Sequence, residues 1–197
     1  DFRGFLDGTG AQTMFNFPTA IAVDNEGIVY VWDSVNRTIR RIAQDGVVKS
    51  HPKGTLANVT SLDMLPGGNI AAADGSRIRN FSSYGNVNDM AGAGTGYEDG
   101  FGSDSRFGSA LAIAVDADGS ILVADTQNHR IRRVSGAKVT TIAGSGNIGT
   151  VDGEGLFSSF SYPDGIAVNT VGTIFVHQRS GETRTISPEG KVGRSSF

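Results

Sequence analysis

The sequence predicts an all-β fold built from consecutive copies of one short antiparallel unit. Glycine is abundant at 28 residues and proline is sparse at 5, a composition that suits short strands joined by tight turns. The segment 15–24 recurs at 107–116 and again at 160–169. No window carries a sustained 3.6-residue apolar period with helix caps. These three observations favour repeated β-structure over a helical or mixed fold.

The spacing of the copies predicts the size of the unit. The copy at Phe107 begins 92 residues after the one at Phe15, and the copy at Phe160 begins 53 residues later. Because 92 is about twice the ~40 to 45 residues of a propeller blade, a further copy is expected between the first two. A degraded copy is present there, with Leu62–Leu65 and Ile70–Asp74 as its first two strands. We therefore predict a single domain over 1–197 with four β-propeller blades, at approximately 1–51, 52–92, 93–144 and 145–197.

The third copy shows the predicted strands most clearly. Asp116-Ala117-Asp118-Gly119 has the chemistry of a tight hairpin turn, because Asp and Gly tolerate positive φ. The apolar run at 121–124 is typical of a strand buried on both faces. Four strands are expected in this copy, at 113–115, 121–124, 131–134 and 138–142.

Several stretches resemble a known repeat family. The stretch Pro18 to Ile42, with Ile21-Ala22-Val23-Asp24, Val29-Tyr30-Val31-Trp32-Asp33 and Ile39-Arg40-Arg41-Ile42, resembles an NHL repeat, and residues 107–144 resemble one more closely. The resemblance implies a β-propeller. The second and fourth copies depart from the pattern, since the loop before Arg77 is two residues shorter and His177-Gln178 replaces the usual Ala-Asp.

A linker motif precedes three of the copies and indicates that the propeller is incomplete. Asp-Gly-x-Gly followed by Phe occurs from Asp7 to Phe15, from Asp99 to Phe107 and from Asp152 to Phe160. The first of these is a blade-to-blade linker, so a preceding blade should feed into it. Open repeat arrays leave apolar end faces. We expect closure by further blades in the same protein or by another copy of the chain.

Acidic residues recur where each second strand ends, at Asp33, Asp74 and Asp125, and Asn36 and Asn128 share a position three residues later. A carboxylate or amide here can accept backbone N–H groups and stabilise the turn into the third strand. Repetition favours this structural role for Asp33, Asp74, Asp125 and Asn128, because a catalytic group is normally needed once. Replacing Asp125 by Ala is expected to lower stability by about 1 to 2 kcal/mol.

The motifs that could carry chemistry each have a structural explanation that we favour. The segment 144–149 matches G-x-G-x-x-G, but no stable helix can begin after it, so it is interpreted as a linker and not as a phosphate site. The arginines at 40–41 and 132–133 recur at one position of the repeat and are interpreted as structural. The acidic turns could hold calcium, but none supplies the full ligand series of an EF-hand loop. The histidines at 51, 129 and 177 lack ligand spacing. The sequence therefore predicts no catalytic residue, no cofactor, no metal and no enzymatic activity.

The leading functional hypothesis is a non-catalytic module for protein or glycan binding or for structural assembly. Tyr97, Glu98, Asp99 and Phe101 are the candidate partner contacts, because this loop-rich segment holds an aromatic pair that strand packing does not demand. Two alternatives stay open. One is a fragment of a six-bladed propeller enzyme of the lyase or lactonase kind whose catalytic residues lie outside this chain. The other is an RNA-binding NHL module.

Charge and sequons bear on partners and compartment. The formal net charge of −3 gives no overall attraction to nucleic acid, and no segment is long enough and apolar enough to insert in a membrane. Possible N-glycosylation sites are Asn36, Asn58 and Asn80, each in an Asn-x-Ser/Thr sequon. They favour an extracellular or secreted glycoprotein weakly over a cytoplasmic one, and the absence of cysteine fits both compartments.

Overall fold

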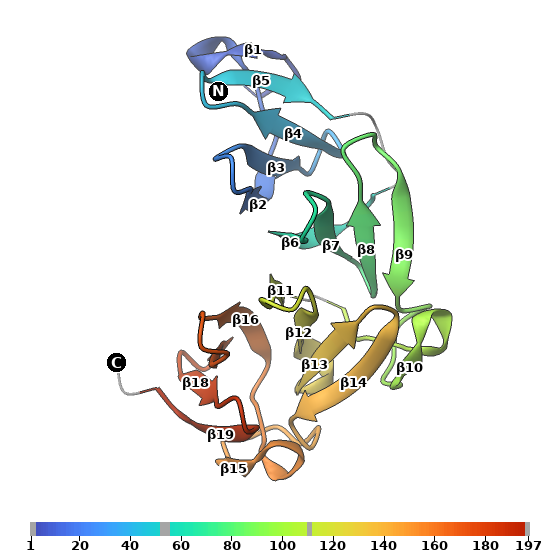
Figure 1. Ribbon diagram of the computed structural model, residues 1–197, viewed down its shortest axis with the longest axis vertical. Coiled ribbons are helices and arrows are strands. Elements are labelled where there is room, and N and C mark those ends of the chain that lie inside the picture. The colour runs from blue at the N-terminus through green and yellow to red at the C-terminus, as the bar shows by residue number, and fades with distance from the viewer. Residues whose placement is uncertain (1–2, 52–55, 110–111, 196–197) are drawn as a thin grey trace. The chain divides into compact units, whose positions relative to one another are not determined.

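The computed structural model describes residues 3–51, 56–109 and 112–195. It confirms the all-β fold, with four antiparallel sheets in chain order (Figure 1). Ala110 and Leu111 of the aligned repeat motif lie outside the described residues. The described helices are four 3-10 turns of three residues each, at Gly10–Gln12, Gly102–Asp104, Thr126–Asn128 and Gly155–Phe157. No helix of the described part is long and apolar enough to cross a membrane.

The chain divides into two compact units, one of residues 1–75 and 79–88, the other of residues 76–78 and 89–197. The first sheet, in the first unit, contains β1 (Gly8–Thr9), β2 (Pro18–Val23), β3 (Val29–Asp33), β4 (Thr38–Ile42) and β5 (Val47–Ser50) in the order β1-β5-β4-β3-β2. The second sheet is β6 (Val59–Met64), β7 (Ile70–Asp74), β8 (Arg77–Phe81) and β9 (Val87–Ala91), and the division between the units passes through it.

The third and fourth sheets belong to the second unit. The third contains β10 (Gly100–Phe101), β11 (Ala112–Val115), β12 (Ile121–Asp125), β13 (Arg130–Ser135) and β14 (Lys138–Ala143). The fourth contains β15 (Gly153–Glu154), β16 (Pro163–Val168), β17 (Ile174–Gln178), β18 (Thr183–Ile186) and β19 (Lys191–Arg194). Both repeat the strand order of the first sheet. The strands of each sheet fall within the ranges expected for the four blades, while the single-domain organisation stays a prediction.

Three sheets carry a fifth strand that the sequence pattern did not reveal. The Asp-Gly-x-Gly linkers form β1, β10 and β15, each two residues long, and these pair with β5, β14 and β19 at one edge of their sheets. A two-residue strand in a glycine-rich linker has no periodicity to detect. The second sheet has four strands, and the sequence between His51 and Val59 lacks the motif.

The hairpin turns form as their sequences indicate. In the first sheet, Asp24 Oδ1 accepts the backbone N–H groups of Glu26 and Ile28 at 3.0 and 2.9 Å. Gly27 has a φ of 75°, which residues with a β-carbon rarely adopt. In the fourth sheet Asn169 makes the equivalent bonds. In the first and fourth sheets, one polar side chain and one glycine therefore determine where the first strand turns into the second.

Each unit has its own apolar core between two sheets. In the first unit, Ala22, Tyr30 and Trp32 pack with Leu62 and Ile70. The core of the second unit has the same construction, with the following buried apolar residues from the third and fourth sheets: Leu122, Ala124, Ile131, Ala143, Phe160, Ile174, Val176, Ile186 and Val192. Burial of this apolar area supplies the main drive for folding.

The other face of the first sheet is apolar and uncovered within its unit. Ile21 is 62% exposed, and it lines a hollow of about 450 Å³ together with Phe15, Val31 and Ile42. The equivalent residue of the fourth sheet, Ile166, packs into the core against the third sheet. Repeat equivalence therefore favours a further blade as the cover of this face, which stays a prediction.

Candidate functional site

The recurring acids at the ends of the second strands each hold neighbouring backbone in place. Asp125 Oδ1 accepts the N–H of Gly108 at 2.8 Å, and its Oδ2 accepts the side-chain amide of Asn128 at 2.8 Å. Asp33 makes the same two kinds of bond with Asn16 and Asn36. Asp74 of the second sheet accepts two backbone N–H groups, from Ala57 and Asn58. The loss of stability expected for Asp125→Ala stays a prediction.

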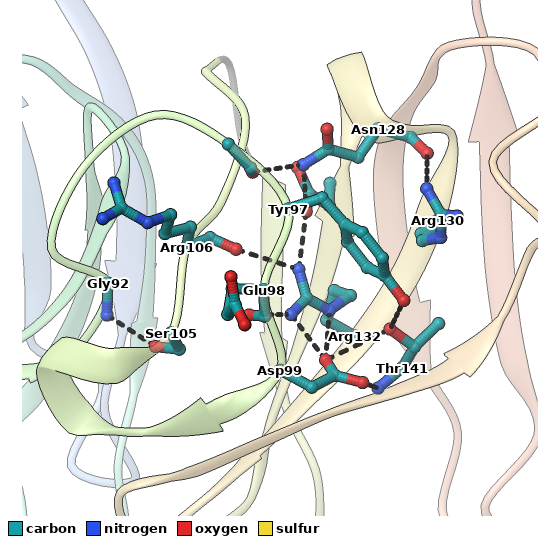
Figure 2. Close-up of polar contacts among 12 residues, drawn as sticks. Gly92, Tyr97, Glu98, Asp99, Ser105, Arg106, Asn128, Arg130, Arg132 and Thr141 are labelled. Carbon is teal, nitrogen blue, oxygen red and sulfur yellow. Dashed lines mark hydrogen bonds and ion pairs between the residues drawn. The ribbon is translucent and has the colours of Figure 1, made fainter.

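Each acid of the first and third sheets also faces a buried arginine. The Arg132 side chain is 0% exposed and its guanidinium makes five hydrogen bonds (Figure 2). Two go to Asp99 Oδ1 at 2.6 and 3.0 Å, and one goes to Asp125 Oδ2 at 2.9 Å. The other two go to the carbonyl oxygens of Arg106 and Glu98. We call Arg132 with Asp99 and Asp125 the arginine clamp. It ties the linker to the third strand of the sheet.

The clamp recurs in the other sheets that have a linker strand. Arg40 binds Asp33 at 3.1 Å and Asp7 at 2.8 Å in the first sheet. In the fourth, Arg184 binds Asp152, while Gln178 stands where the acid would be. The arginines are wholly buried and bound to the linkers, so their charge serves the fold. The acids of the linkers Asp7, Asp99 and Asp152 were not identified as clamp residues from the sequence.

Burial and hydrogen bonding oppose each other in their effect on the pKa of Asp125 in the third sheet and of Asp7 in the first. Burial raises the pKa of Asp125, although bonds from Asn128, Gly108 and Arg132 pull it down. At Asp7, burial also acts to raise the pKa, but hydrogen bonds from Ser50 and the charge of Arg40 outweigh it, and the pKa lies below its ordinary value. The inner carboxylate is thus held by its partners against the cost of losing water.

The candidate partner contacts divide between the clamp and the surface. Tyr97 is 43% exposed, lies 3.7 Å from the Arg130 guanidinium and meets Thr141 through its hydroxyl. Asp99 is a clamp residue, and the carbonyl of Glu98 accepts from Arg132. Phe101, on β10, is 62% exposed. Three of the four residues therefore brace the linker, and Phe101 presents an aromatic ring to solvent.

The three sequons lie in different environments. Asn58 is exposed. Asn36 is half-buried, and its side-chain amide donates to Asp33 and to the carbonyl of Gly4. Asn80 lies half-buried within β8. Among them, Asn58 is the most accessible to a glycosyl transferase.

The glycine-rich segment 144–149 uses its backbone groups within the linker. The N–H groups of Gly144 and Ser145 donate to the carbonyl oxygens of Gly155 and Ser158. The linker continues into the short β15 and a three-residue 3-10 turn. These two amides are therefore committed to the linker, whereas a phosphate loop points its amides at the ligand.

One pair in the fourth sheet has the geometry of a functional group. His177 Nδ1 lies 2.8 Å from Asp164 Oδ1, and Arg179 Nε lies 3.6 Å from Asp164 Oδ2. Sequence analysis noted His177 only as a departure from the repeat, and it did not identify Asp164 or Arg179. Among residues 3–51, 56–109 and 112–195, no three His, Asp or Glu side chains gather as metal ligands.

His129 gives the second unit a pH dependence. It is nearly buried, and its Nδ1 accepts the backbone N–H of Tyr162 at 3.2 Å. Burial, and next the charge of Arg130, lower the pKa of His129, with Asp125 acting against them. The folded state therefore resists protonation of a ring that the unfolded chain protonates near pH 6.5.

We expect His129→Asn to weaken the pH dependence of stability. Below about pH 6.5 the unfolded state binds a proton that the folded state excludes, so the free energy of unfolding falls as pH falls. Urea unfolding at pH 7 and pH 5 measures the decrease. The decrease in the free energy of unfolding should be smaller in the variant. Part of the decrease should remain, because burial and Arg41 also lower the pKa of His51. An identical decrease in both proteins would contradict the assignment.

The comparisons confirm the repeat and the fold. Residues 107–134 match the model of the NHL repeat. A Bacteroides thetaiotaomicron protein of unknown function has a TM-score of 0.77 at 20% identity, covering 91% of this chain and 48% of its own. An auxiliary nutrient binding protein from Bacteroides ovatus has a TM-score of 0.71 at 17% identity, covering 92% and 47%. This chain thus spans about half the length of these solved structures.

A curated relative matches over a shorter stretch. The Arabidopsis thaliana protein SUPPRESSOR OF QUENCHING 1, chloroplastic, is 27% identical over 124 residues. The match covers 61% of this chain and 11% of that protein. The relative is therefore much longer than the segment it shares with this chain.

The sequence-based prediction that this chain has no enzymatic activity is wrong, because the solved structures with a similar fold include enzymes. Virginiamycin B lyase from Staphylococcus aureus has a TM-score of 0.62 at 15% identity, covering 91% of this chain and 55% of its own. A gluconolactonase from Xanthomonas campestris has a TM-score of 0.56 at 14% identity, covering 90% and 75%. The same fold therefore includes enzymes. Sequence motifs missing from one segment did not justify the exclusion, because propellers assemble sites from several blades.

Proposed function

We propose, from the premise that this chain is an NHL-repeat β-propeller segment, that it is a binding module of a larger protein with a glycan as its partner. The observation that carries the proposal is the exposed ring of Phe101 on a braced linker. Phe101 is adjacent in sequence to Gly102, whose N–H is bonded to Ala137. An aromatic ring on a rigid edge contacts a ligand at little entropic cost.

The neighbouring residues support the same surface. Tyr97 is stacked on Arg130 and hydrogen-bonded to Thr141, so its ring has one orientation. Glu98 adds an exposed residue next to Tyr97 in the sequence, and glycan hydroxyls donate to carboxylates. The nutrient-binding protein among the solved structures uses the same fold. In keeping with a glycan partner, we place the chain outside the cell, with Asn58 as its accessible sequon.

A glycan array tests the proposal. The longest expressible form of the protein is expected to bind a subset of neutral or acidic oligosaccharides, and Phe101→Ser should weaken that binding at least tenfold without changing the melting temperature. Tyr84→Ser is the matched control, since Tyr84 is 84% exposed on a turn of the second sheet. Binding that survives Phe101→Ser, or falls equally in the control, would exclude this surface. If no oligosaccharide binds and cross-linking captures a protein at Phe101, the partner class is protein and the glycan proposal is wrong.

Catalysis is the second candidate function. A histidine whose Nδ1 is held by a carboxylate can accept a proton at its other nitrogen, which is the usual arrangement of a general base. His177 and Asp164 have that arrangement, and the lyase and the gluconolactonase show that the fold is compatible with enzymes.

A further inference from the structure

The fourth sheet departs from the repeat at three positions that meet in space. Asp164, Gly165 and His177 stand where the first copy has Thr19, Ala20 and Trp32, and where the third copy has Leu111, Ala112 and Ala124. Gly165 and His177 lie directly opposite each other in the pairing of β16 with β17. Asp164 is the adjacent residue. Departures that converge on one place indicate a shared cause.

Gly165 packs closely against His177. A β-carbon at Gly165 would lie 3.0 Å from His177 Cβ, which is closer than most real contacts of this kind. Gly165 does not have a positive φ, so its backbone conformation does not call for glycine. The first and third copies place alanine here, opposite Trp32 and Ala124, so the glycine is particular to the fourth sheet.

A β-bulge directs Asp164 toward the histidine. The register of β16 and β17 shifts between Pro163 and Gly165, which leaves Asp164 as the extra residue. The first sheet has the same shift around Thr19, so the bulge belongs to the repeat and the carboxylate is particular to this sheet. Bulges re-aim side chains and are frequent near functional sites.

The pair contributes little to stability as it stands. The His177 side chain is 52% exposed and that of Asp164 is 33% exposed. Water competes for both partners of a pair this exposed, so such a contact stabilises a fold only weakly. His177 also takes the place of an apolar side chain at a strand position that is buried in the first and third copies, where Trp32 and Ala124 stand. Stability alone therefore does not explain the three departures.

We propose that this cluster binds a small hydroxylated carboxylate, such as a sugar acid. His177 Nδ1 is hydrogen-bonded to Asp164, which leaves Nε2 as the ring nitrogen for a ligand hydroxyl. The Arg179 side chain is 56% exposed and its Nε lies 3.6 Å from Asp164 Oδ2, so its guanidinium is accessible to a ligand carboxylate. The ring of Tyr162, 5.8 Å from the Arg179 guanidinium, forms an apolar wall beside them. The cluster is distinct from Phe101 and its braced linker.

The decisive variant returns the sheet to the repeat pattern. It combines Asp164→Thr, Gly165→Ala and His177→Ala, three residues that occur at these positions in other copies. Calorimetry with D-gluconate is the measurement, with D-glucose lacking the carboxylate and acetate lacking the hydroxyls. Wild type should bind gluconate at least tenfold more tightly than either. The triple variant should lose at least tenfold in affinity and melt at the same or a higher temperature, because it removes a functional compromise.

Single variants separate the contacts. Arg179→Ala should also lose at least tenfold in gluconate affinity. Arg194→Ala should bind as wild type does, and it removes an arginine of the same sheet whose side chain is 66% exposed, against 56% for Arg179. The proposal is overturned if wild type does not prefer gluconate, if the triple variant retains its affinity, or if the triple variant melts at a lower temperature. Phe101→Ser should bind gluconate as wild type does. The gluconate proposal and the glycan proposal can therefore be disproved independently of each other.

Discussion

Asp125→Ala is expected to lower the free energy of unfolding by about 3 kcal/mol, because it leaves the buried charge of Arg132 without its inner partner. Both side chains are fully buried and their atoms lie 2.9 Å apart. The loss exceeds the 1 to 2 kcal/mol expected of a turn residue alone. It stays at the low end for a broken buried pair since Asp99 and two carbonyls still hold the guanidinium. For a chain of this size the melting temperature should fall by roughly 6 to 12 °C.

Asp99→Ala is the matched control for that measurement. It removes the other carboxylate from the same arginine, but the Asp99 side chain is 40% exposed, so water replaces part of what is lost. We expect a loss of about 1 kcal/mol. Thermal and urea unfolding of both variants test the difference. Equal losses, or an Asp125→Ala protein that melts as wild type does, would show that burial of the inner carboxylate does not control the clamp.

Gly144→Ala is expected to destabilise the second unit strongly. Gly144 begins the linker that follows β14 with a φ of 95°. Its added β-carbon would lie 2.5 Å from the carbonyl oxygen of His129 and 3.0 Å from Arg130 Cα. Both are backbone atoms of a paired strand region and cannot turn aside. Positive-φ strain and overpacking together predict a loss of about 3 kcal/mol or more.

Gly136→Ala isolates the steric part of this effect. Gly136, in the turn between β13 and β14, also has a positive φ, at 59°, but an added β-carbon meets no atom within 4 Å. The cost there is the conformational one alone, about 1 kcal/mol. Unfolding in urea compares the two variants under one condition. If the two variants lose similar free energies of unfolding, the backbone around His129 moves away from the added β-carbon of residue 144 without cost.

Repetition separates structure from function in this molecule. The arginines and acids that recur in the sheets are buried and bound to the linkers, as at Arg40 and Arg132. The features that occur once are exposed, as at Phe101 and His177. A residue needed in every blade serves the blade, whereas a ligand needs its contacts only where it binds. The functional proposals therefore rest on the residues that break the repeat.

The sequence by itself determined the repeat, the all-β class and the places of the longer strands in the third copy. The apolar run predicted at 121–124 became β12, because burial on both faces and the flanking turn residues are local properties of the chain. These inferences need only neighbouring residues and a period, and both are written in the order of the amino acids. The turn role of Asp125 stays a prediction, since the backbone N–H that it accepts belongs to Gly108, 17 residues earlier.

Only the tertiary structure decided which distant residues share an environment. Asp99 precedes Arg132 by 33 residues and Asp164 precedes His177 by 13. The linker strands, the clamp acids and the histidine pair all depend on how a linker or a bulge packs, which no periodicity encodes. The non-enzymatic prediction failed for a related reason, since it was drawn from motifs within one segment. Chemistry in a repeat fold arises from side chains brought together across strands, so it depends on folding and not on spacing alone.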